Sequence, residues 1–246
     1  MLVLHSKATI PTGTVAFWLS LWRDRMFHVE HPDEISVPAT PSSVNEVFGS
    51  RVKLAEAYAV WLAGAGIERG LIGPREVDRL WERHILNSAV LGNVIDDGAR
   101  VVDVGSGAGL PGIPLAIARP DLHVQLLEPL LRRTTFLKEV VEDLGLNNVE
   151  VIRGRAEERE SISAAGNADV VTSRAVAPLG KLTGWSLPLV RKGGSMRALK
   201  GASVSEELVR DAREIKKFGG DSGRVEVVGQ SVLAEPTQVV IIERIK

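Results

Sequence analysis

The residues that point most directly to chemistry form an acidic motif with alternating glycines. Asp103 is followed by Gly105, Gly107 and Gly109, and residues 101–104 are mostly valine. Valine-rich runs of this length are typical of buried strands. Because glycine has no side chain, a loop of this composition lets the backbone approach a ligand closely. The motif therefore predicts a ligand site where a strand ends.

Two glycine registers compete here, and they imply different ligands. Gly107, Gly109 and Gly112 match the dinucleotide fingerprint G-x-G-x-x-G, which should begin directly at the end of a strand. In that register Pro111 would stand where the helix should already be forming. The register that starts at Asp103 ends the strand before the first glycine, and it is the hallmark of Rossmann-like methyltransferases that use S-adenosyl-L-methionine (AdoMet). We favour this second register; a purely structural turn is the alternative to both.

Two later strand ends carry candidate cofactor contacts. Glu128 closes the strand at residues 123–127, where a carboxylate can accept hydrogen bonds from both ribose hydroxyls. That position also serves NAD enzymes, and the alternative is a cap on the next helix. Ala156 and Glu157 follow the third strand, where methyltransferases of this fold line the adenine. Ala156 would lie against the ring and Glu157 would bind its amino group, unless Glu157 is only a solvated charge.

Two basic residues are further candidates. Arg174 follows the fourth strand, and its planar, always-charged fork suits a carboxylate or a phosphate. It would hold the AdoMet carboxylate or position RNA, or else form a structural salt bridge. His84 has the chemistry of a general base, but we favour a helix histidine that is hydrogen-bonded between domains. No catalytic residue is assigned.

Hydrophobic periodicity predicts the elements that position these residues. Strands and helices alternate after residue 98, which indicates a parallel sheet with helices on both faces. We expect an α/β, Rossmann-like class I AdoMet-dependent methyltransferase fold, with a mostly parallel seven-stranded sheet and a small N-terminal helical cap. The expected strands are 101–104, 123–127, 149–152, 169–172, 196–199 and an antiparallel pair at 225–228 and 239–242; the expected helices are 113–118, 132–144, 182–190 and 203–218. We expect a Gly193-Gly194 turn before the fifth strand.

Three regions are expected along the chain. Residues 1–25 are interpreted as a disordered leader or a start-site extension, with Met26 as the true start. Their apolar run at 14–22 is shorter than the about 20 residues that span a bilayer, and no signal-peptide cleavage site follows it. Residues 26–97 form the helical cap, with one helix from Val44 and a second after Pro74. Residues 98–246 form the methyltransferase domain.

Composition excludes several classes of protein. The 246 residues are 44% hydrophobic and 25% charged, with a net charge of −1, as in an ordinary soluble domain. The absence of cysteine excludes disulfides, thiolate metal sites and cysteine nucleophiles, and it is consistent with a cytoplasmic location. Residues 132–200 carry 12 Lys and Arg against 8 Asp and Glu, so a phosphate-backbone partner would favour this region.

The extended glycine motif carries a specific resemblance. Residues 103–117 read Asp-Val-Gly-Ser-Gly-Ala-Gly-Leu-Pro-Gly-Ile-Pro-Leu-Ala-Ile. This run closely resembles the bacterial 16S ribosomal RNA (guanine-N7) methyltransferases, also called RsmG or the glucose-inhibited division protein B family. Matching pieces stand in the right order at 83–88, 126–137, 173–175 and 199–201, so the similarity runs from about Met26 to the C-terminus.

The resemblance implies a cofactor, a substrate and contacts. AdoMet contacts are implied at Gly105, Leu110, Ala156, Glu157 and Arg174. The family often has Asp where Glu128 and Asn87 stand here; Glu128 keeps the carboxylate, whereas Asn87 leaves an ionic role at its position in doubt. The implied substrate is a guanine of 16S rRNA, alone, in the small subunit or in an assembly intermediate. A protein acting as a monomer, with no membrane partner and no metal, is expected.

Guanine N7 carries no proton, so methylating it needs no general base. Catalysis should come mainly from holding N7 in line with the methyl group, which is worth about 7–11 kcal/mol. We expect basic residues near strand ends or on the helices that follow to contact the RNA, with strong salt dependence: Arg132, Arg133, Arg174, Lys181, Arg197 and Lys200. The rival hypotheses are a methyltransferase for small molecules or proteins, a non-catalytic RNA- or nucleotide-binding module, and, least favoured, an NAD-linked oxidoreductase.

Overall fold

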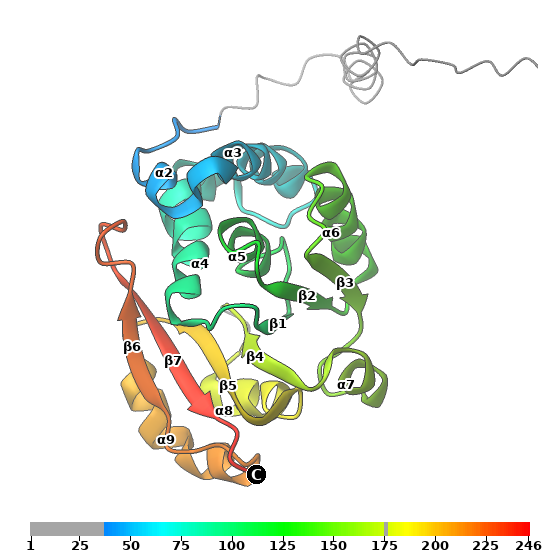
Figure 1. Ribbon diagram of the computed structural model, residues 1–246, viewed down its shortest axis with the longest axis vertical. Helices are drawn as coiled ribbons and strands as arrows, with labels where there is room; N and C mark the ends of the chain where they lie inside the picture. The colour runs from blue at the N-terminus through cyan, green and yellow to red at the C-terminus, as the bar shows by residue number, and fades with distance from the viewer. Residues whose placement is uncertain (1–36, 175–176) are drawn as a thin grey trace, which may run out of the picture. The chain divides into compact units, whose positions relative to one another are not determined.

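A single seven-stranded sheet organises the molecule (Figure 1). The computed structural model describes residues 37–174 and 177–246, so the predicted leader at 1–25 lies outside the described residues. The strands are β1 (Arg100–Val104), β2 (His123–Glu128), β3 (Val149–Arg153), β4 (Ala168–Thr172), β5 (Val190–Lys200), β6 (Arg224–Val228) and β7 (Thr237–Glu243). Their order is β3-β2-β1-β4-β5-β7-β6. The first five are parallel, and β7 is antiparallel to both β5 and β6.

This topology positions a ligand site. The chain goes from β1 to β2 on one side and returns to β4 on the other, so β1 and β4 form the switch point at which loops diverge. In open sheets of this kind, ligands bind beyond the carboxyl ends of the strands at the switch point. The predicted fold class is confirmed: the strands follow the class I methyltransferase plan.

Helices cover both faces because successive strand residues point in opposite directions. On β1, Val101 belongs to one core, shared with α5 (Gly112–Ala118) and α6 (Leu131–Asp143). Val102 and Val104 belong to the other, shared with α7 (Arg159–Ala165), α8 (Leu179–Ser186) and α9 (Val204–Lys217). All three valines are at least 96% buried. A strand buried on both faces explains the nearly unbroken run of valines.

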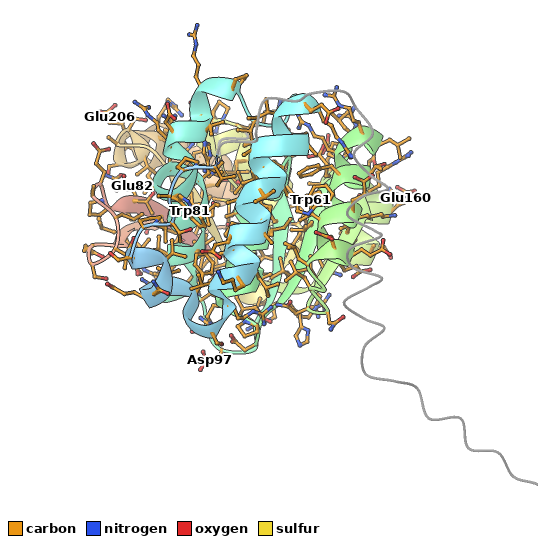
Figure 2. The ribbon with its side chains drawn as sticks, turned by 90° about the horizontal axis from the view of Figure 1, so that it is seen from above. Trp61, Trp81, Glu82, Asp97, Glu160 and Glu206 are labelled. Atoms are coloured by element: carbon orange, nitrogen blue, oxygen red, sulfur yellow. The ribbon has the colours of Figure 1, made fainter. Side chains whose placement is uncertain are left out.

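The N-terminal helices pack on the α5 face, and they are less regular than the predicted pair. The first comprises α2 (Ser43–Phe48), a 3₁₀ turn (Gly49–Arg51), α3 (Val52–Trp61) and a π turn (Leu62–Gly66). The second comprises a 3₁₀ turn (Pro74–Arg79), a π-helical segment (Leu80–Leu86), α4 (Asn87–Ala89) and a 3₁₀ turn (Val90–Val94). Figure 2 shows Trp61 between α3 and α6, where its indole N–H donates to Asp143 at 2.7 Å.

Two predictions about elements are wrong. The helix expected at 182–190 runs from Leu179 to Ser186, and β5 begins at Val190 and passes through the expected turn. Gly193 has φ +76° and the β4–β5 register shifts here, so the glycines form an irregularity inside a strand. A side chain at Gly194 would collide with the Asp169 carbonyl at 2.6 Å, which explains the glycine. Helix α7 was not expected at all, because its charged sequence lacks a hydrophobic stripe.

Candidate functional site

The glycine loop connects β1 to α5 at the predicted edge of the sheet. Gly105, Gly107 and Gly109 all have positive φ, at 72°, 59° and 98°. A side chain at Gly109 would also lie 2.8 Å from Ile113 Cγ1, so the loop has no room for one there. The register that starts at Asp103 is the one the backbone adopts, since β1 ends at residue 104.

The amide groups of this loop are largely occupied by the protein itself. Gly105 N–H donates to the Leu127 carbonyl at 2.8 Å, and Gly109 N–H donates to the Ser106 carbonyl at 2.7 Å. Gly107 N–H donates to a carboxylate oxygen of Glu128 at 3.0 Å. A pyrophosphate site needs such amides free to point at the ligand. These bonds therefore disfavour a dinucleotide as the ligand. The groups around the loop that remain to bind a ligand are mainly carboxylates.

Glu128 closes the loop from the end of β2. One of its oxygens accepts from Gly107, and the other accepts from Leu130 N–H at 3.1 Å. Its side chain is 1% exposed, and Arg133 lies 3.7 Å away. Both predicted roles are compatible with this position, because the carboxylate holds the start of the α6 connection and each oxygen retains a further lone pair.

Asp103 lies beneath the loop and is fully buried. Its Oδ2 accepts from Gly112 N–H at 3.1 Å, whereas Oδ1 has no hydrogen-bond partner among the described residues. Burial outweighs this hydrogen bond and raises the pKa of the carboxyl to about 7. A side chain at Gly112 would lie 2.9 Å from Oδ2. The last glycine of the motif is therefore required by the carboxylate beneath it.

Tyr58 contributes to the site from α3, and sequence reasoning missed it. The side chain is fully buried, and its hydroxyl donates to the Ala108 carbonyl at 2.8 Å. It therefore fixes the middle of the glycine loop from the helical layer above. It is the only tyrosine of the chain and falls within the first predicted helix, where nothing in the local sequence indicates a contact with the glycine loop.

Arg174 extends from the end of β4 toward the N-terminal helices. Nη1 donates to the Arg83 carbonyl at 2.9 Å, and Nη2 lies 2.8 Å from Nδ1 of His84. No carboxylate lies within 4.0 Å of it among the residues the structure describes, so the alternative of a salt bridge finds no support there. His84 in turn contacts Glu76 at 2.9 Å, which confirms a hydrogen-bonded histidine.

Ala156 and Glu157 follow β3, as predicted, but they have different surroundings. Ala156 is buried in the same core as Val104 and Leu127. Glu157 is exposed and lines a groove of about 740 Å³ with residues of α8 and α9, among them Lys181 and Trp185. Leu110 is also buried, at 6% exposure, next to the glycines. Asn87 is the first residue of α4 and is half-buried.

The predicted RNA-contacting residues do not form one patch. Arg132 is exposed at the start of α6, beside Arg133. Lys181 is exposed on α8, with its ammonium 4.8 Å from the centre of the Trp185 ring. These residues, unlike the two below, remain accessible to a polyanion.

Lys200 and Arg197, two further residues expected to contact RNA, have little exposed surface and each lies beside an acid. Lys200 is 12% exposed and pairs with Glu207 at 2.7 Å, joining β5 to α9. Arg197 is 16% exposed, lies 3.8 Å from Asp96, and lines a separate groove near the amino ends of β1 and β4. Arg197 lies away from the glycine loop, because its strand position turns it toward the segment before β1, and its contact with RNA stays a prediction.

No helix in the described part of the chain is both long and apolar enough to cross a membrane. Residues 177–246 and 37–174 likewise contain no group of three or more His, Asp or Glu placed to hold a metal ion.

Comparison with known proteins places the chain in a family. A family model described as "rRNA small subunit methyltransferase G" matches residues 51–234. The ribosomal RNA small subunit methyltransferase G of Corynebacterium jeikeium is 66% identical over 218 residues, covering 89% of this chain and 96% of that protein. The protein of the same name from Mycolicibacterium smegmatis is 57% identical over 209 residues, covering 85% and 88%.

Among solved structures, P. horikoshii TYW2 in complex with MeSAdo aligns with a TM-score of 0.50. It shares 15% identity and covers 65% of this chain and 61% of that one, so it supports the fold alone. The family model and the curated relatives, in contrast, match most of the sequence and include the glycine motif. The chain belongs to the rRNA small subunit methyltransferase G family.

Proposed function

We propose that this protein methylates N7 of a guanine in 16S rRNA, by in-line transfer from AdoMet and without a general base. The names of the C. jeikeium and M. smegmatis relatives support ribosomal RNA of the small subunit as the substrate. The guanine and its N7 atom are supported by the resemblance at residues 103–117. A ribosomal substrate would place the activity in the cytoplasm, and the protein would act as a monomer.

The occupied loop amides are the observation that carries the cofactor assignment. With Gly105, Gly107 and Gly109 donating to protein oxygens, the loop offers acceptors to a ligand: the Glu128 carboxylate and the unpartnered Oδ1 of Asp103. AdoMet carries hydroxyls, an ammonium group and a positive sulfur, which are the complementary chemistry. The residues present therefore fit AdoMet better than a dinucleotide.

The residues that would hold AdoMet lie around the carboxyl ends of four strands. Glu128 would accept from the ribose, and the buried Ala156 would lie against the adenine, with Glu157 at its amino group. Arg174 would bind the methionyl carboxylate or a phosphate of the RNA. The remaining cofactor contacts would come from the end of β1 and the glycine loop: Asp103, Gly105, Gly107, Gly109 and Leu110. When bound, AdoMet supplies a methyl group on a positively charged sulfur.

The protein's part in the reaction is positioning and electrostatics. N7 has a free lone pair, so no side chain has to remove a proton, and none near the loop is assigned that role. Holding the reacting groups in line supplies about 7–11 kcal/mol. The methylated purine gains positive charge, and carboxylates such as Asp103 and Glu128 would stabilise that charge at short range.

Mapping methylation in ribosomal RNA tests this proposal directly. Cells that lack the protein should retain one unmethylated guanine in 16S rRNA, and the full-length chain should restore the modification. In vitro, radiolabelled AdoMet is offered with small subunits, with naked 16S rRNA and with a metabolite extract. Label in the RNA, released by cleavage chemistry selective for N7-methylguanine, is the expected result. An unchanged methylation pattern, or label only in metabolites, would refute it.

A further inference from the structure

The guanidinium of Arg174 is held by residues that lie 90 and 91 positions earlier in the chain. Arg174 forms an isolated bridge with Leu199 just beyond β4, so its backbone is fixed at the end of the sheet. Its side chain then reaches the π-helical segment Leu80–Leu86, where Nη1 donates to the Arg83 carbonyl and Nη2 lies 2.8 Å from His84 Nδ1. These two contacts use two of the five N–H donors of an arginine and leave three for a ligand.

The contact with Arg174 determines the tautomer of His84. A guanidinium has only donors, so Nδ1 of His84 must be the acceptor and carry no proton. The ring proton is then on Nε2, which lies 2.9 Å from Oε2 of Glu76 and donates to it. The His84 side chain is only 9% exposed, so both of these contacts are largely shielded from solvent. The result is a directed chain from Arg174 through neutral His84 to Glu76.

The charges around His84 favour this neutral form. Burial and the nearby Arg174 lower the pKa of His84 below its ordinary value, against the opposing effect of Glu76. On the side of Glu76, Arg83 lies 3.4 Å from the same carboxylate oxygen, and the His84 hydrogen bond holds the pKa of Glu76 low. On the far side, Asp103 and Tyr58 face Arg174.

Protonating His84 would break its hydrogen bond with Arg174 and keep the one that Nε2 donates to Glu76. An imidazolium has no acceptor at Nδ1, so Arg174 would lose one of its two anchors and face a second positive charge in a buried position. When a guanidinium positions a reacting group, a displacement of the guanidinium by about 1 Å can lower the reaction rate about 100-fold. The π-helical geometry of residues 80–86 is consistent with such a role, because π turns occur frequently at functional sites.

We infer that His84, oriented by Glu76, is a positioning residue that aims Arg174 at the AdoMet or RNA ligand of the site. The inference rests on the proposed function, in which Arg174 contacts the cofactor or substrate. It assigns His84 no contact with the reacting atoms.

Two isosteric substitutions in the full chain test the inference. His84→Asn keeps an acceptor at the position of Nδ1, whereas His84→Gln places its amide at the position of Nε2. We expect kcat/KM for RNA methylation to fall about 10- to 100-fold in H84Q and to stay within about threefold of the wild-type value in H84N. Calorimetry on the same proteins measures their affinity for AdoMet in the absence of RNA, and so provides a readout that does not depend on methylation.

A double-mutant cycle separates positioning from general support of the fold. In an Arg174→Ala background, H84Q should cause no further loss, because the residue it positions is gone. Equal losses in H84N and H84Q, the same loss from H84Q with and without Arg174, or wild-type activity in Arg174→Ala would each overturn the inference. If the wild-type protein itself binds AdoMet but methylates no RNA, the proposed function fails first, and the AdoMet affinities of H84N and H84Q still test whether His84 aims Arg174 at the cofactor.

The pH profile and the imidazole itself provide two further readouts. Wild-type kcat/KM should fall at acid pH as His84 gains a proton, and H84N should lose that part of the profile, while the contribution of Asp103 remains in both. Nitrogen NMR of the wild-type protein should show His84 as the Nε2–H tautomer near neutral pH, a result that needs no folded variant. An Nδ1–H tautomer, or an acid limb unchanged in H84N, would refute the inference.

Discussion

The buried carboxyl of Asp103 should make the protein less stable as the pH rises. Its pKa in the folded protein is about 7, raised from 3.8 by burial. Between these two values the folded protein binds more protons than the unfolded chain, so the free energy of unfolding falls with increasing pH. The stabilisation is present in full below about pH 4 and is lost as the pH rises through 7.

The size of the effect follows from the pKa shift. One pKa unit corresponds to 1.36 kcal/mol, so the two units between pH 5 and pH 7 cost about 2.7 kcal/mol, with little further loss above pH 7 because the folded carboxyl is then ionised. For a chain of 246 residues this is a change in Tm of about 5–10 °C. Asp103→Asn does not titrate, so its stability should lack this component.

The assay is thermal unfolding of both proteins from pH 5 to pH 8 at constant ionic strength. The wild-type Tm should fall more steeply than that of D103N by the amount above, while all other titrating groups contribute equally to both curves. Asp121 is the matched control: Arg119 lowers its pKa, so this carboxyl is ionised in both the folded and the unfolded chain over this range, and Asp121→Asn should leave the slope unchanged. Parallel curves for wild type and D103N would refute the reasoning. Should D103N not fold, carbon NMR of the wild-type carboxyl gives the pKa directly.

Four further substitutions, one of them with a matched control at a second glycine, test other residues. Tyr58→Phe removes the donor to a buried loop carbonyl and should lower the free energy of unfolding by about 1–3 kcal/mol in urea titrations. Gly109→Ala should abolish AdoMet binding in calorimetry, because its φ is +98° and the new methyl meets an isoleucine, whereas Gly145→Ala, in open space, should cost only about 1 kcal/mol of strain. Lys200→Met removes the ammonium partner of the half-buried Glu207, which keeps the Leu179 N–H and Arg210, and should cost about 1–2 kcal/mol without changing the salt dependence of RNA binding. Arg132→Ala should leave stability unchanged and reduce the salt slope by about one.

The central part of the fold was predictable because its signals are local. The valines before the glycine motif, the spacing to Glu128 and the antiparallel ending all follow from strand periodicity and turn residues, and the structure confirms them. The failures have tertiary causes. The start of β5 was divided between the end of a helix and a turn, because paired glycines are typical of turns. Only the close approach of the Asp169 carbonyl to Gly194 shows why these glycines lie inside a strand.

The site was predictable only where the sheet builds it. Asp103 and Glu128 stand at fixed distances from strand ends, so the sequence locates them. Lys200 and Arg197 show the limit of that reasoning: a basic residue near a strand end was expected to face RNA, yet each finds an acid on another element. Nothing in the local pattern of a single sequence reveals such a partner.

The helical layer also contributes to the site, and this explains which residues were missed. Tyr58 bonds to the glycine loop from α3, and His84 holds Arg174 from the π-helical segment. The loop amides already donate to protein oxygens, so this part of the sheet supplies acceptors, whereas Arg174, the donor proposed for the ligand, contacts a histidine from the helices. A change in the N-terminal helices that displaces His84 should therefore alter AdoMet or RNA binding while the glycine loop keeps its hydrogen bonds. That separation is expected only if the helical layer is part of the site and not merely a cover for the sheet.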